Sequence, residues 1–254
     1  MRTLLWIWAV ISVITCSTVH AQNFGGEVGR WRVTGSQSAD TFSLTQAVPS
    51  GTRAVITLGW EATSSMALSS IVDSKGNTWT VHVTKFINSV HQCAVASANV
   101  VKPLAAGDSV TVNWTAGQSA DRSAMLLYVK NVPAGSPLTQ NSFNSYGTAV
   151  SAPITLSDSN AFVVGLVQIE QNATYSGSAG TPVGARVTYG DSSTTVGLCN
   201  YVFYKDGPFS AGKFDPLGTI SVNKSYVVLQ VAFKVGAVAQ QVAPPSNLRI
   251  LSGS

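Results

Sequence analysis

The sequence predicts an all-β protein: a single antiparallel β-sandwich, jelly-roll-like in plan, built from two repeated halves. Nearly every segment between residues 40 and 235 is a short apolar or β-branched run closed by a Gly, Pro, Asn or Asp turn. No window of a dozen residues has the apolar spacing of an amphipathic helix. The same five-part order of strands occurs twice, over about residues 53–132 and 160–235. Neither half is expected to bury its apolar face alone, so the two halves should close over one interior.

The first half opens with a strand over residues 53–60, where β-branched and apolar residues follow one another as in a core strand. A turn at residues 73–77 follows, because Gly76 can adopt positive φ and Asp73 can bond its own backbone. This turn leads into a strand over residues 78–83.

Later strands of both halves follow the same rules. Residues 109–114 alternate with period two, so Val110, Val112 and Trp114 should face the interior. Residues 226–233 repeat this apolar character near the end of the second half. The sandwich domain is therefore expected to cover residues 22–235.

Residues 1–21 read as a secretory signal peptide, with Arg2 as the positive start, an apolar stretch, and a small-residue cleavage site ending at Ala21. The apolar stretch is too short and too interrupted to span a bilayer. We therefore expect a secreted protein, extracellular or at the cell surface, with no membrane span after cleavage. Residues 236–254 change character and are expected to form a linker or tail, stiffened by Pro244 and Pro245.

Two cysteines remain after the leader, Cys93 and Cys199, at matching places in the two halves. Export favours a disulfide between them, whereas two separately buried thiols are the alternative, because free cysteine is a common core residue. The sequence leaves both interpretations open.

Composition excludes one class of partner. Charged residues make up only 10% of the chain, against about 25% in ordinary domains, and the net charge is +4. The basic residues are scattered singly, without a cluster that could follow a phosphate backbone, so no nucleic-acid partner is expected.

Three stretches carry a family resemblance: VPSGTRAVITLGW, IVDSKGNTWTV and ASANVVKPLAAGDSVTVNW. Their D-x-x-G-N-x-W turn and G-D-x-V-T-V strand resemble a repeated pattern in secreted bacterial and phage-associated β-sandwich surface modules. The tail APPSNLRILSGS resembles the start of a fibronectin type III domain. The resemblance implies a surface, adhesion or glycan-related role and supplies no catalytic residues.

Aromatic residues outside the expected core strands are the candidate ligand-binding groups. A planar ring can stack on the C–H face of a sugar while nearby polar groups bond its hydroxyls. The candidates in loop-like sequence are Trp31, Tyr175 and Phe209. Asp73, Asn77 and Asp108 are candidate calcium ligands, since Ca²⁺ takes carboxylate and amide oxygens; their place in turns explains them equally well. No other cofactor is expected.

No catalytic constellation marks an enzyme. Glu61 and Glu170 follow corresponding strands, and two carboxylates at suitable separation would suit a glycoside hydrolase; solvated strand ends are the alternative. The leading hypothesis is a secreted, non-catalytic module that binds a glycan or another surface ligand. The rival is a structural subunit of a fibre or shell, in which residues 22–33 or the tail from Ala237 add a strand to a neighbour's sheet.

Overall fold

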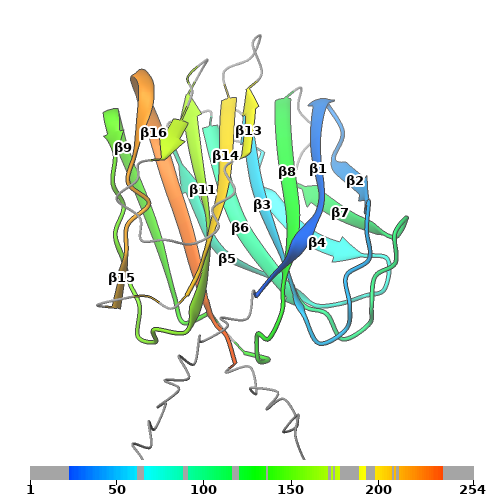
Figure 1. Ribbon diagram of the computed structural model, residues 1–254. Coiled ribbons are helices and arrows are strands. Elements are labelled where there is room, and N and C mark those ends of the chain that lie inside the picture. Colours follow the sequence, from blue (N-terminus) through cyan, green and yellow to red (C-terminus); the bar gives the residue numbers. More distant parts are fainter. Residues whose placement is uncertain are drawn as a thin grey trace, which may run out of the picture.

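The computed structural model describes residues 23–61, 66–87, 91–115, 120–135, 137–170, 173, 175–177, 189–192, 198–207, 209 and 212–236. These residues form sixteen strands (Figure 1) and include no α-helix. The predicted leader and, apart from Gly236, the predicted tail lie outside them. No helix in the described ranges is long and apolar enough to cross a membrane.

The first eight strands make a large sheet and a small sheet. The large sheet has the order β1-β8-β3-β6-β5, and the small sheet has the order β2-β7-β4. The strands are β1 (Phe24–Gly35), β2 (Ala39–Ser43), β3 (Arg53–Glu61), β4 (Leu68–Asp73), β5 (Trp79–Phe86), β6 (His91–Asn99), β7 (Ser109–Trp114) and β8 (Ala120–Val129).

The last eight strands repeat this order. The second large sheet runs β9-β16-β11-β14-β13, which is the order of the first with eight added to every strand number. A small pair, β10-β15, corresponds to β2-β7, and β12 attaches to β16. The strands are β9 (Thr139–Val150), β10 (Ile154–Thr155), β11 (Ala161–Glu170), β12 (Tyr175–Gly177), β13 (Tyr189–Ser192), β14 (Leu198–Asp206), β15 (Lys213–Phe214) and β16 (Gly218–Lys234).

The predicted all-β antiparallel sandwich built from two repeated halves is confirmed. Each copy has the eight strands of a jelly roll, and it starts earlier than the sequence pattern suggested, at β1 and at β9. Residues 22–33 are expected to add a strand to a neighbour's sheet, but residues 24–33 instead form most of β1, which pairs along its length with β8.

The interior differs from the single core that we expected. One cluster lies between the first large sheet and its small sheet, and a second covers the outer face of the second large sheet. A third lies between the two large sheets, which pack face to face. Both faces of a central strand are therefore buried: in β3, Val55 belongs to the third cluster and Ile56 to the first. This explains why such strands are apolar without interruption.

The two large sheets are related by an approximate two-fold arrangement. β3 packs against its own equivalent β11, β5 packs against β9, and β8 packs against β14. β6 likewise packs against β16. Since β6 and β8 are the equivalents of β14 and β16, the interface has two corresponding sides. We call the side at β5, β6, β9 and β16 the closed edge, and the side at β1, β8 and β14 the open edge.

Candidate functional site

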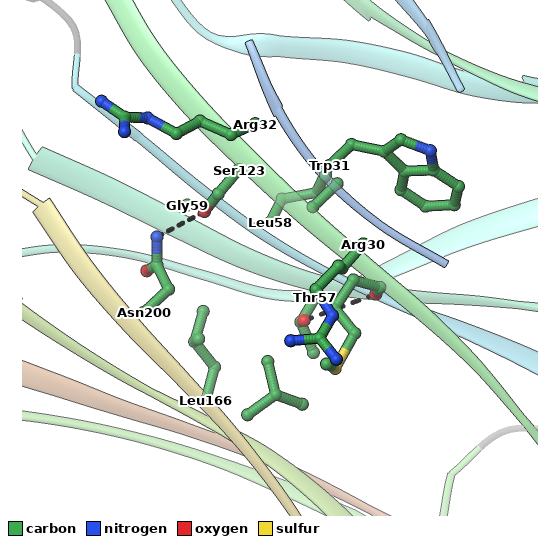
Figure 2. A pocket seen from close by; sticks show the side chains of 12 residues that line it. Arg30, Trp31, Arg32, Thr57, Leu58, Gly59, Ser123, Leu166 and Asn200 are labelled. Atoms are coloured by element: carbon green, nitrogen blue, oxygen red, sulfur yellow. Dashed lines mark hydrogen bonds between the residues drawn. The ribbon is translucent and has the colours of Figure 1, made fainter. Parts of the chain in front are cut away.

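A cavity of about 290 Å³ lies between the two large sheets at the open edge. Its apolar wall comes from Met125 of β8, Leu166 of β11 and Val202 of β14. Arg30 and Arg32 of β1 line it as well, and both are exposed, so the cavity reaches solvent along β1 (Figure 2). The site therefore joins strands from both halves of the chain.

An amide and a hydroxyl face each other inside this cavity. Asn200 is only 6% exposed, and its Nδ2 donates to Ser123 Oγ at 2.5 Å (Figure 2). Within the described part of the chain, Asn200 Oδ1 is buried without a hydrogen-bond partner. Such an acceptor normally has one, and leaving it unpaired costs about 1–3 kcal/mol. Asn200 Oδ1 is thus an unpaired acceptor buried in the cavity wall against Gly59.

Gly59 makes room for this amide. A Cβ at Gly59 would lie 2.3 Å from Asn200 Oδ1, so any larger residue would displace the side chain. Because β3 crosses the interface centre here, the absence of a side chain on Gly59 sets where Asn200 sits.

The two arginines at the rim are held by carboxylates. Arg30 Nε lies 3.0 Å from Glu27 Oε1, and Arg32 Nη2 lies 3.0 Å from Asp121 Oδ2. These pairs balance most of the charge of the two planar guanidinium groups that line the cavity. The rim is therefore polar and close to neutral rather than strongly cationic.

A second cavity of about 230 Å³ continues the first, and both include Met125 and Val202. It is lined also by Phe24 and Tyr204, whose rings stack with centroids 4.2 Å apart and planes within 8°. Phe24 is half-buried, so part of its ring faces solvent. Together the two cavities form a groove with an aromatic end and a polar end.

At the closed edge a valine and a cysteine stand where the open edge has Ser123 and Asn200. Aligning β3 and β11 at their final residues, Glu61 and Glu170, makes Gly59 equivalent to Gln168. Gly59 pairs with Ser123 and Cys93, whereas Gln168 pairs with Val227 and Asn200. Ser123 is therefore equivalent to Val227, and Asn200 to Cys93.

Trp31, a predicted ligand-binding residue, does line the cavity, but its ring has another partner. The indole stacks on Phe42 with centroids 4.9 Å apart and is directed away from Asn200 (Figure 2). It packs against the core of the first half.

Tyr175 and Phe209 are not exposed as expected. Each is only 5% exposed and belongs to the core of the second half. Tyr175 donates its hydroxyl hydrogen bond to the carbonyl of Pro216, and Phe209 packs edge-on against Phe214. The sequence of these segments resembles that of loops because the strands that cover the core of this half are only two or three residues long.

The candidate calcium ligands have other partners. Asp73 Oδ1 accepts from the backbone N–H groups of Lys75 and Asn77, at 2.9 and 3.2 Å, and Asp73 Oδ2 accepts from Trp79 Nε1. Asp108 accepts from the backbone of Ala105, and this bond lowers the pKa of its carboxyl. Among the described residues no group of three or more acidic, His or Cys side chains could hold a metal ion. The contacts match the turn interpretation, and calcium binding stays a prediction.

Glu61 and Glu170 end corresponding strands of the two facing sheets, as the repeat predicted. Glu61 lies opposite His91 in the first large sheet. Burial lowers the pKa of His91, while the charges of both glutamates act to raise it, so both carboxylates are within electrostatic reach of this imidazole. The glutamates are half-buried rather than fully solvated. Their catalytic use stays a prediction.

Cys93 is a free, buried thiol, so the structure does not contain the disulfide that we considered. Its Sγ donates weakly to the carbonyl of Lys85, and burial raises its pKa well above the usual value. By register its equivalent is Asn200, one residue away from the expected match. The side chain of Cys199 lies outside the described ones.

Sequence reasoning missed Arg30, Arg32, Ser123 and Asn200. One signal was available: Arg30 and Arg32 are two residues apart and so lie on one face of β1.

No family model matches this chain, and comparison with the curated proteins and with the solved structures gives no match either.

Proposed function

We propose that this protein is a secreted, non-catalytic module that binds a glycan in the groove at the open edge. The observation that carries the proposal is the combination of Asn200 and Ser123 with an apolar wall and a partly exposed Phe24. A sugar offers an apolar C–H face and a ring of hydroxyls, which these groups complement.

The charges at the rim favour a neutral ligand. Arg30 and Arg32 are each paired with a carboxylate, so a fully anionic ligand would have to compete with Glu27 and Asp121. Paired side chains are held in one orientation, and less conformational entropy is then lost when they bond hydroxyls. Secretion rests on the leader predicted at residues 1–21.

The test is binding of the full chain to an array of neutral and acidic glycans, followed by affinity measurements on a double variant, Arg30→Ala/Arg32→Ala. We expect binding by the wild type and at least a tenfold weaker affinity in the variant. The matched control is Lys102→Ala/Lys213→Ala, which removes two exposed lysines elsewhere on the surface and should bind as the wild type does. A blank array, or equal loss in both variants, would contradict the proposal.

The glycoside hydrolase alternative is separated from this proposal by product analysis. If the protein releases reducing sugar from a bound glycan, and Glu61→Gln/Glu170→Gln abolishes this release, the protein is an enzyme and not a binding module. Binding without turnover keeps the proposal.

A further inference from the structure

β9 is the outermost strand of the second large sheet (Figure 1). It pairs with β16 on one side, and no described strand pairs with its other side. β5 contacts β9 from the facing sheet and therefore covers its face rather than its edge. Backbone N–H and C=O groups along an open edge are a template for another strand.

The sequence of β9 does nothing to block such pairing. TQNSFNSYGTAV contains no charged residue and no proline. The other outer strands of the large sheets all carry charges: Glu27, Arg30 and Arg32 in β1, Lys85 in β5, and Asp191 in β13. Edge charges are a common protection against strand addition, so β9 stands out as the unprotected edge.

Two exposed rings stand on this edge, on opposite faces of the sheet. Phe143 is 40% exposed and lies opposite Val228, on the outer face of the sheet. Tyr146 is 69% exposed and has the opposite parity along the strand. Regular pairing with β16 breaks after Gly147, whose φ is +148°, so the straight part of the edge is residues 139–146.

We propose that β9 pairs antiparallel with β9 of a second copy of this chain, so that two molecules share one continuous sheet across a two-fold axis. A two-fold axis brings each edge against itself, and a charged edge then meets its own charges. β9 has no charged residue, so pairing with β9 of a second copy brings no like charges together. Each exposed aromatic gains a cross-strand neighbour from the partner.

The test is sedimentation velocity of the full chain over a wide range of concentrations. We expect a concentration-dependent dimer. In Asn144→Lys/Ser145→Lys, which places one charge on each face of the strand at exposed positions, the dissociation constant should rise at least tenfold. The control is Thr80→Lys/Val81→Lys, the same change at exposed positions of β5, and it should dimerise like the wild type.

Circular dichroism and thermal melting of each variant establish that it is folded. A wild type that stays monomeric at every concentration overturns the proposal. So does a folded β9 variant that still dimerises, or a β5 variant that weakens association equally.

Discussion

The two edges of the inter-sheet interface start from the same strand plan and differ in how they are filled. At the closed edge the ring centroid of Phe233 lies 5.0 Å from Cζ of Arg53, and the ring also contacts His82 edge-on. At the open edge Ser123 and Asn200 replace Val227 and Cys93, and a groove remains. The same strand plan therefore gives two different edges: side chains fill the closed edge, whereas a groove remains at the open edge.

The largest expected effect is on the closed edge. Phe233→Ala removes a ring that is 1% exposed and should lower the free energy of unfolding by about 3–5 kcal/mol, since truncated core aromatics leave cavities. Phe24→Ala, at the half-buried aromatic end of the groove, should cost about 1 kcal/mol. Urea unfolding of both variants measures this, and similar losses would mean that the edges do not differ as described.

Exchanging equivalent residues between the edges should give the next largest effect. Cys93→Asn buries an amide with valine where Asn200 has Ser123 and with Gln168 where Asn200 has Gly59, and should cost about 2–4 kcal/mol. Asn200→Cys removes an amide whose carbonyl is already unpaired, and should cost less than about 1 kcal/mol. Urea unfolding of the two single variants compares them, and a greater loss for Asn200→Cys would contradict the assignment of the edges.

Acid should weaken the closed edge through His82. Burial and, secondly, the charge of Arg53 lower the pKa of His82 from 6.5 to about 4. The unfolded chain then binds the proton more readily than the folded one, so stability is full above pH 6.5 and is lost as the pH falls towards about 4. Because the ring is partly exposed, we expect a loss of about 1–2 kcal/mol.

The control for this pH dependence is His82→Gln, which cannot titrate. Urea unfolding between pH 7 and pH 4 should show a shallower slope in this variant. Some slope should remain, since burial lowers the pKa of His91 as well. An unchanged slope would show that His82 does not cause the pH dependence of stability.

The smallest expected effect on stability is at the open edge. Arg30→Ala breaks an ion pair whose arginine and glutamate side chains are 54% and 26% exposed, and should change the free energy of unfolding by less than about 1 kcal/mol. The melting temperature should therefore stay within a few degrees of the wild type, as differential scanning calorimetry would show. A large shift would make Arg30 a structural residue instead of a rim residue.

The sequence predicted the fold well, because strand alternation and turn residues are local. Val110, Val112 and Trp114 lie in the core as the period of two predicted. The candidate site was harder, because it depends on which strand of one half meets which strand of the other. Arg32 and Asn200 are far apart in the chain, and no local pattern shows that β1 and β14 border one groove. The prediction that Tyr175 and Phe209 are exposed was wrong for a related reason: their loop-like segments cover the core of the second half.

Thiol labelling at equivalent positions tests the difference between the edges most directly. In a Cys93→Ala/Cys199→Ala background, a cysteine is introduced by Ser123→Cys at the open edge or by Val227→Cys at the closed edge. The native Ser123→Cys protein should react with a small maleimide at least a hundred times faster than the native Val227→Cys protein. Equal rates would contradict the account.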